Sequence, residues 1–353
     1  VGNSPAADLG FNQAMDILTR CGISGKVVLK LEKGTYHRNL DFSSIVGMER
    51  NASLTLTSVS GRDSDVVIIA DKEAPALTLA NTCNFTLEKV TLKGYANGSS
   101  STALHLAGNN RNLMVRHCIL RTEALNSSNA SGVAIYGNSI LPDTLVRIIG
   151  NRMTGNGGIC LNASSAQHGH DYVIDSNEII SPYVYGIYTN YCNIRTISHN
   201  YIHKQASETS AEYGLYPMNT YGVACQLSRF SCNRVHGAFN YALSVREQYS
   251  KGRFGNDTSA PVIISNNEFI CSGYSTGNNV VFRGVGGHVL FCNNTVLVPQ
   301  GATRTYLVMF DAYNSGHFKF LNNNLVNYGT TAYMVYSNGT DKQEDYADAW
   351  DYN

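Results

Sequence analysis

A phrase of Asn, one variable residue and one apolar residue, each time after a β-rich run, recurs along the chain. Successive copies are separated by unequal intervals, the shortest of 23 residues from Asn177 to Asn200. Unequal spacing excludes helical repeats of fixed length and favours a coil whose turns differ in loop length. The seven Asn residues are Asn151, Asn177, Asn200, Asn233, Asn267, Asn294 and Asn323; Val90 and Cys118 hold the same place in two earlier copies.

Between the Asn phrases lies a second, weaker repeat, in which a small residue precedes an alternating run such as "GICLNA" (158–163) or "GIYTN" (186–190). Each interval therefore carries at least two short strands separated by turn residues. Stacked coils of such strands bury a continuous core that no single coil could bury. The repeat predicts an all-β fold, a single-stranded parallel β-helix. We expect the recurrent Asn to adopt the left-handed conformation and to form a ladder of side-chain hydrogen bonds.

We interpret residues 1–353 as one domain with distinct ends. At about 5–22 the pattern predicts an amphipathic cap helix, with Asp8 at its start and Gly22 at its end. Coils are expected at about 26–340, and the acidic segment 341–353 is predicted to be a tail or a polar cap. The apolar face of the helix is expected to consist of Phe11, Ala14, Met15, Ile17 and Leu18.

Nearly the whole chain, from residue 5 to about 340, resembles a known family. The predicted helix followed by "GKVVLKLEKGTY", "LTLTSVSG" and "LTLANTCNFTLEKVTLKG" is similar to the start of right-handed parallel β-helix proteins of the pectate-lyase-like superfamily. The later coils resemble the repeats that these proteins share with secreted bacterial polysaccharide-active proteins. The resemblance implies a secreted or cell-surface location, with a signal peptide removed before Val1. The superfamily includes lyases, glycosidases, epimerases, tailspikes and adhesins, so the fold does not determine the activity.

Composition excludes several classes of partner. The formal net charge is zero and 15% of residues are charged, so the chain lacks the basic surface that nucleic acid requires. No run of 18 apolar residues is present, and no membrane span is expected. There are nine Cys residues without a paired zinc spacing, and we interpret Cys118, Cys232 and Cys292 as buried thiols.

A candidate site follows from aligning the second strand of each coil by its inward residues. One outward column is then expected to hold Asn162, Asn190, Met218, Arg246, Arg283 and Asp311. A parallel column is expected to hold His105, Cys160, Tyr188, Tyr216, Ser244 and Met309. A register error of one residue would reverse the side chains of a strand. Long insertions beside these columns bring Tyr249 and Lys251 near them.

These columns have two interpretations. In the first, tyrosines contact sugar rings and arginines grip carboxylates, which makes a groove for an acidic polysaccharide or surface glycan. Arg246 and Arg283 would then clamp a carboxylate, Tyr188 and Tyr216 would transfer protons, and Asn162, Asn190, Asp311, Tyr249 and Lys251 would bind substrate. In the second, the columns are an ordinary solvated sheet in which Arg246 and Arg283 pair with Asp311.

A different face is expected after each Asn phrase, with His203 and His236 on successive coils. Their spacing would suit a metal, but the neighbouring Arg152, Glu178 and Arg234 favour cross-strand charge pairing. We predict no metal site and no cofactor; a calcium ion is compatible with the resemblance, although no residues for it are identified.

Two functions therefore stay open: a polysaccharide lyase acting by β-elimination, and a non-catalytic glycan-binding or adhesive protein. The Tyr and Arg columns favour the lyase. The absence from the sequence of the Asp pattern of polygalacturonases, of the Asp-Pro-His-Glu signature of alginate epimerases and of a recognisable lyase motif favours the binding protein.

Overall fold

The computed structural model describes most of the chain. The described residues are 1–2, 7, 9–43, 45–49, 51–95, 101–122, 132–140, 144–163, 169–204, 211–218, 228–246, 261–272, 279–285, 287–302, 305–311, 316–329, 332–338 and 347–351. No helix in these ranges has the length and apolar character that crossing a bilayer requires.

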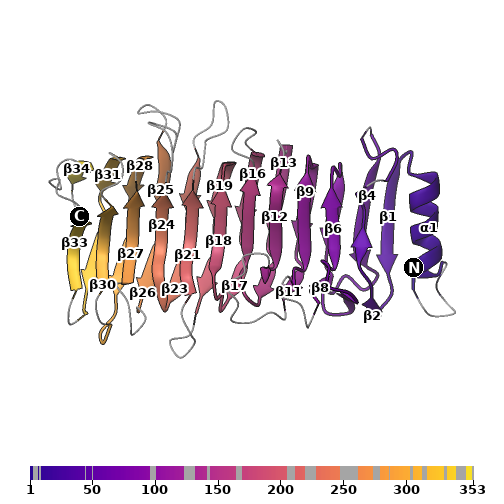
Figure 1. Cartoon of the computed structure of the whole chain (residues 1–353), viewed down its shortest axis with the longest axis horizontal. Helices are drawn as coiled ribbons and strands as arrows, with labels where there is room; N and C mark the ends of the chain where they lie inside the picture. Colours follow the sequence, from indigo (N-terminus) through magenta and orange to yellow (C-terminus); the bar gives the residue numbers. More distant parts are fainter. Residues whose placement is uncertain are drawn as a thin grey trace.

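Three parallel sheets run along the molecule, and each coil contributes one strand to each sheet (Figure 1). The first sheet consists of β1 (Lys26–Leu31), β4 (Ser53–Ser58), β7 (Phe85–Glu88), β10 (Arg111–Arg116), β13 (Thr144–Ile149), β16 (Gly169–Asp175), β19 (Cys192–Ser198), β22 (Arg229–Ser231), β25 (Val262–Ser265), β28 (Gly287–Cys292), β31 (Gly316–Leu321) and β34 (Ala347–Asp351). The second consists of β2 (Gly34–His37), β5 (Val66–Ile69), β8 (Thr91–Lys93), β11 (Ile119–Arg121), β14 (Arg152–Thr154), β17 (Glu178–Ile180), β20 (Tyr201–His203), β23 (Arg234–Gly237), β26 (Glu268–Cys271), β29 (Thr295–Val298) and β32 (Asn324–Asn327). The third consists of β3 (Leu40–Asp41), β6 (Leu77–Ala80), β9 (Leu104–Gly108), β12 (Ile135–Ile140), β15 (Ile159–Ala163), β18 (Tyr185–Asn190), β21 (Ala211–Met218), β24 (Phe239–Arg246), β27 (Asn279–Val285), β30 (Thr305–Asp311) and β33 (Ala332–Asn338).

This arrangement confirms the parallel β-helix that the Asn repeat predicted. Strands of successive coils pair in register, as Ile148 with Ile174 and Ile174 with Ile197. All three side chains are fully buried. Inward residues of the three sheets therefore stack along the helix axis into one continuous core. Towards the C-terminal end, aromatic residues fill the core: Phe282, Phe291, Phe310, Phe318 and Phe320.

The predicted Asn ladder is present between the first and second sheets. The side-chain amides of the first six ladder Asn residues, from Asn151 to Asn294, donate to the side-chain oxygen of the Asn one coil further on, at 2.9–3.1 Å, and also to a backbone carbonyl. The seventh, Asn323, donates to the Phe291 carbonyl at 3.0 Å. The ladder stops at Cys118, whose backbone N–H donates to the side-chain oxygen of Asn151 at 3.0 Å. One part of the prediction was wrong, because the left-handed conformation belongs to the preceding residue. That residue is Gly150, Ser176, His199, Cys232, Asn266, Asn293 or Asn322.

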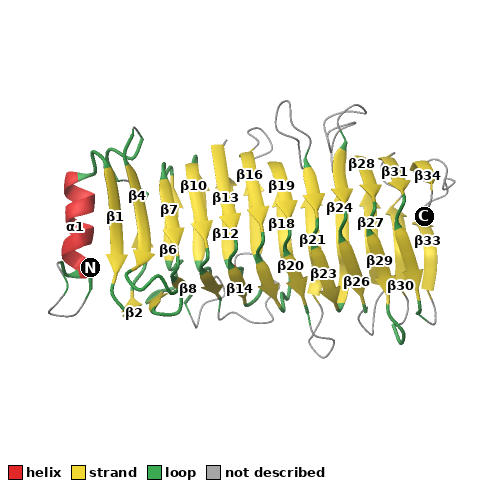
Figure 2. Ribbon diagram, turned by 180° about the vertical axis from the view of Figure 1, so that it is seen from behind, coloured by secondary structure: helices red, strands yellow, loops and turns green. Residues whose placement is uncertain are grey.

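The N-terminal helix α1 (Phe11–Cys21) covers the open side of the first coil (Figure 2). Phe11, Ala14 and Leu18 are buried, but Ile17 is 43% exposed, contrary to its predicted place on the apolar face. The helix is shorter than expected and begins after Gly10, without a side-chain cap. Asp8 lies outside the described residues. Gly22 ends the helix as predicted, with φ of 66° and its N–H bonded to the Leu18 carbonyl.

Two further differences concern the end of the chain and the cysteines. The segment predicted to be an acidic tail or cap contributes β34, which pairs in parallel with β31. Cys118 is buried as expected, whereas Cys232 is exposed and Cys292 is partly exposed. Cys232 is exposed because it occupies the left-handed turn position, with φ of 58°, where the side chain points away from the core.

Candidate functional site

Five tyrosines and two arginines lie together on the outer side of the third sheet. We define this set as the tyrosine–arginine face: Tyr185, Tyr188, Tyr213, Tyr216, Tyr241, Arg246 and Arg283. Strand pairing aligns Tyr185, Tyr213 and Tyr241 in one column and Tyr188 with Tyr216 in a second. The sequence therefore places aromatic side chains at equivalent positions of three successive coils.

A local irregularity brings both columns to the same side of the sheet. In strict alternation Tyr185 and Tyr188, three residues apart, would point to opposite faces. Between them, Gly186 and Ile187 both face the core. The inward direction at Gly186 is seen from the position of a Cβ placed there, which would lie 2.6 Å from the Ile202 side chain. Two consecutive inward positions put Tyr185 and Tyr188 on one face, with ring centroids 4.8 Å apart.

The rings stack on one another both within a strand and between successive coils. Tyr213 lies 4.2 Å from Tyr216 and 5.0 Å from Tyr241, with interplanar angles of 15° in both pairs. Tyr185 stacks on Tyr213 at 5.7 Å. Because much of each ring face contacts a neighbouring tyrosine, the ring edges and hydroxyls of the partly exposed Tyr185, Tyr188, Tyr213 and Tyr241 are the parts best placed to meet a ligand.

Each arginine is held by a tyrosine. The Arg246 guanidinium donates to the Tyr216 hydroxyl at 3.5 Å, and the Arg283 guanidinium lies 4.8 Å from the centre of the Tyr241 ring. Contacts of this kind limit the conformations of long side chains and so reduce the entropy lost on binding. Both arginines are partly exposed.

The register prediction was right for Arg246 and wrong for Arg283. Arg246 pairs with Met218, which pairs with Asn190, so Arg246 belongs to the predicted Asn162 column. Arg283 pairs with Ser244 and Met309, which places it in the neighbouring column with Tyr188 and Tyr216. The cause is the continuous burial of Val280, Val281 and Phe282, which hides the alternation that would have fixed the register.

Burial changes the acid–base properties of this face. It is the main cause of the strongly raised pKa of Tyr188, to which Cys160, Tyr185 and Tyr216 also contribute. Burial raises the pKa of the Cys160 thiol to about 12. At neutral pH both groups therefore keep their protons: Tyr188 can donate a proton or a hydrogen bond, and Cys160 is not a nucleophile. Tyr216 is only 5% exposed and Ser244 is fully buried, although both belong to the outward column.

The predicted substrate-binding residues divide into two groups. Asn162 and Asn190 are neighbours on successive coils, and the Asn190 amide donates to the Asn162 oxygen at 2.7 Å. Asp311 lies on β30 opposite Asn338, but its side chain is outside the described residues, as are Tyr249 and Lys251 entirely. The ion pair of Asp311 with Arg246 or Arg283 therefore stays a prediction.

Sequence reasoning missed the column of Tyr185, Tyr213 and Tyr241. The signal was present as a recurrent Tyr, small residue and apolar residue in "YGI", "YGL" and "YAL". A search for the small residue alone passed over the Tyr before it. Tyr136 was also missed; it pairs with His105 and Cys160 and extends the second column towards the N-terminus.

The outer side of the second sheet carries paired charges, as predicted. Arg152 lies 3.1 Å from Glu178, which also contacts His203 at 3.3 Å, and His236 lies 2.7 Å from Glu268. His203 and His236 pair directly on β20 and β23. In the described part of the chain, His, Cys, Asp and Glu side chains form no group of three or more with a geometry suited to a metal ion.

Comparisons with known proteins assign no family. No family model matches the chain, and no curated protein matches it. Among solved structures it is similar to the pectin methylesterase PemA from Erwinia chrysanthemi, with 10% sequence identity and a TM-score of 0.28. The match covers 99% of this chain and 91% of that chain. At this TM-score the likeness bears on neither the site nor the activity.

Proposed function

We propose that the tyrosine–arginine face binds an acidic polysaccharide. The observation that carries the proposal is the pair of guanidinium groups held by tyrosines, Arg246 by the Tyr216 hydroxyl and Arg283 by the Tyr241 ring. Guanidinium groups bind carboxylates with paired hydrogen bonds. A polymer with repeated carboxylates suits cations on neighbouring coils, which repeat about every 4.8 Å along the sheet.

Neighbouring polar groups support a sugar ligand in particular. The edges of the stacked tyrosines combine apolar carbon with hydroxyls, and Asn162 and Asn190 add amides on the adjoining coils. Binding of a polysaccharide outside the cell agrees with the secreted or cell-surface location expected from the sequence. That location is part of the proposal.

A second candidate function is cleavage of the same polymer by β-elimination. It is favoured by the 3.5 Å contact between the Tyr216 hydroxyl and the Arg246 guanidinium, since a phenol beside a guanidinium suits proton transfer next to a bound carboxylate. In this reaction the proton next to the uronate carboxylate passes to a base, for which Tyr216 beside Arg246 is the candidate; the bond to the leaving oxygen breaks, a double bond forms, and the leaving oxygen takes a proton from an acid. Arg246 and Arg283 would stabilise the charge that develops on the carboxylate. The raised pKa of Tyr188 suits the role of proton donor to the leaving oxygen and opposes the role of base.

The two candidates are separated by one experiment. The protein is run through gels that contain polygalacturonate, alginate or neutral glucan, and each polymer is then assayed for unsaturated uronate by ultraviolet absorbance. Retardation by an acidic polymer without product supports binding alone, and product supports the lyase.

Variants connect the result with the face. Arg246→Gln is expected to weaken retardation by about tenfold or more, since it removes a charge-assisted hydrogen bond. Exposed Arg20→Gln, on α1, is the matched control and is expected to behave as the unmodified protein. Equal retardation of the unmodified protein by acidic and neutral gels, or no effect of Arg246→Gln, contradicts the proposal.

A further inference from the structure

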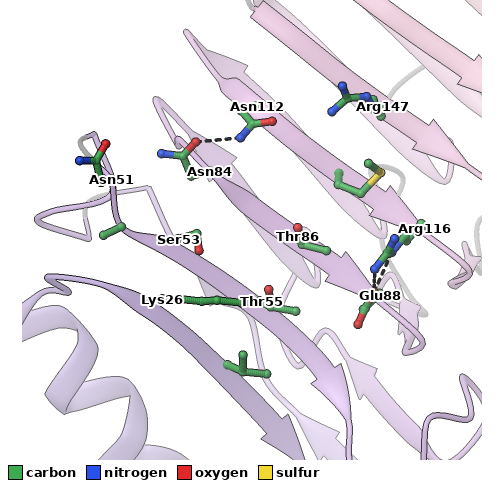
Figure 3. Close-up of a pocket in the computed structure, with 13 residues that line it drawn as sticks. Lys26, Asn51, Ser53, Thr55, Asn84, Thr86, Glu88, Asn112, Arg116 and Arg147 are labelled. Atoms are coloured by element: carbon green, nitrogen blue, oxygen red, sulfur yellow. Dashed lines mark hydrogen bonds and ion pairs between the residues drawn. The ribbon is translucent and has the colours of Figure 1, made fainter.

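The first sheet carries a hollow of about 600 Å³ close to the N-terminal helix (Figure 3). The tyrosine–arginine face lies on a different sheet, the third. The lining of the hollow comes from β1, β4, β7, β10 and β13 and from the turns before them. The volume is in the range typical of small-molecule sites.

The shape of the hollow follows from three columns of side chains. The floor is the column of Val28, Thr55 and Thr86, paired across β1, β4 and β7, and these side chains are short. Longer side chains border the floor on both sides. Figure 3 shows Asn51, Asn84 and Asn112 in a row along one border and the Glu88–Arg116 pair on the other.

Both borders are fixed by contacts between coils. The Asn112 amide donates to the Asn84 oxygen at 2.8 Å, and the Asn84 amide donates to the Met48 carbonyl at 3.0 Å. The left-handed backbone of Asn84 and Asn112 turns their side chains outward. On the other border the Arg116 Nε lies 2.7 Å from the Glu88 carboxylate, whose side chain is only 16% exposed. A hollow with fixed borders loses little entropy when a ligand enters.

The described residues that line the hollow carry a net positive charge. Glu88 is neutralised by Arg116, whereas Lys26 and Arg147 make no ion pair within the described ranges. Arg147 continues the floor column, because it pairs with Met114, which pairs with Thr86. Two cations thus remain, one from β1 and one from β13, at opposite ends of the hollow.

We infer that this hollow is a binding site for a short acidic oligosaccharide that lies along the helix axis. Hydroxyls of Thr55 and Thr86 and amides along one border match sugar hydroxyls, Val28 and Met114 offer apolar contact, and Lys26 and Arg147 suit carboxylates. The five strands span about 19 Å at about 4.8 Å a step, which is the length of an oligosaccharide rather than of one sugar. None of the described residues that line the hollow is aromatic, so they offer no stacking surface for nucleic-acid bases.

The inference is tested by calorimetric titration of the full chain with tetragalacturonate, and with neutral cellotetraose for comparison. The hollow predicts saturable binding of the acidic tetrasaccharide and much weaker binding of the neutral one. Arg147→Gln is expected to reduce affinity at this site by about tenfold or more. Lys319→Gln is the matched control, because Lys319 is an exposed cation on the same sheet, far from the hollow, and no change is expected.

The two faces are distinguished by combining variants. If both bind, the unmodified protein takes two tetrasaccharides per chain, Arg147→Gln weakens the binding of one and Arg246→Gln weakens the binding of the other. If the tyrosine–arginine face does not bind, one site remains and depends on Arg147 alone. The inference is overturned if no acidic tetrasaccharide binds, if binding is insensitive to Arg147→Gln, or if Lys319→Gln weakens it equally.

Discussion

The side-chain oxygen of Asn200 accepts two hydrogen bonds from Asn177, one of 2.9 Å from its side-chain amide and one of 3.0 Å from its backbone N–H. Both residues are 1% exposed. The same double contact links Asn200 to Asn233 one coil further on. A single side chain therefore satisfies polar groups of two coils in a place that water does not reach.

Asn200→Ala is expected to lower the free energy of unfolding by about 3 kcal/mol or more, because several buried groups lose a partner at about 1–3 kcal/mol each. The amide and N–H of Asn177 lose their acceptor, and the Ile174 carbonyl loses a donor. Urea unfolding followed by circular dichroism measures the change. Asn324→Ala, at an exposed position of β32, is the control, with an expected effect of about 0.5 kcal/mol or less. Equal effects of the two substitutions would show that the ladder does not stabilise the fold.

Gly186→Ala is expected to destabilise the protein by about 1–3 kcal/mol and to disturb the tyrosine stack. A Cβ at Gly186 would lie 2.4 Å from the Gly214 carbonyl oxygen, so β18 must shift and carry Tyr185 and Tyr188 with it. Gly25→Ala is the matched control, since no atom lies within 4 Å of a Cβ placed there. Near-ultraviolet circular dichroism reports the stack and thermal unfolding reports stability. An unchanged tyrosine signal in Gly186→Ala would be evidence against the inward position of Gly186.

Stability is expected to depend on His236 in weakly acidic solution. Burial lowers the pKa of His236 in the folded protein below its ordinary value of 6.5, against the opposing effect of Glu268. The unfolded chain then binds more protons than the folded chain at weakly acidic pH. The contribution of neutral His236 to the free energy of unfolding is therefore fully present above pH of about 6.5, and it is lost as the pH decreases from there to the pKa of His236 in the folded protein. His236→Gln should reduce this fall, and substitution of exposed His37 should leave it unchanged. The comparison uses urea midpoints between pH 8 and pH 5; a steeper fall in His236→Gln would refute the assignment.

Thiol reagents are expected to distinguish the cysteines by exposure. Burial raises the pKa of Cys118 and of Cys160 to about 12, so neither forms a thiolate near neutral pH. Cys21 and Cys232 are exposed and should react first with iodoacetamide. Peptide mapping by mass spectrometry identifies the modified residues, and labelling in urea provides the control in which all of them react. Rapid labelling of Cys160 in the folded protein would mean that the face above it is open.

The sequence was sufficient to predict the coil architecture because the ladder Asn recurs at one structural position. The sequence was insufficient to predict which side chains point outward wherever several consecutive residues are buried. In β24, Ala242, Leu243, Ser244 and Val245 are all buried, so inward and outward residues cannot be separated by polarity. The sequence pattern predicted the left-handed conformation for the ladder Asn, one residue after the residue that adopts it, for another reason. The residue that adopts it changes from Ser176 to His199 to Cys232, whereas the Asn beside it is constant.

The candidate site was predicted in part. Tyr188, Tyr216 and Arg246 lie where alternation placed them, and Asn162 and Asn190 are neighbours as expected. The stack that organises them depends on the two consecutive inward residues Gly186 and Ile187, which a simple two-residue period does not contain. The hollow on the first sheet depends on differences in side-chain length between adjacent columns, and these become visible only when the register of five strands is known.

The segment from Glu178 to Asn200 is one complete coil of 23 residues, and it begins and ends at the same hydrogen-bonded step of the ladder. The coils on either side of this segment therefore meet it through the same Asn side-chain hydrogen bonds. A duplicate of this segment would fit between Asn200 and Tyr201 and lengthen the protein by about 4.8 Å for each copy. Insertion and deletion of whole coils thus offer a way to change the size of a β-helix without redesigning its interior.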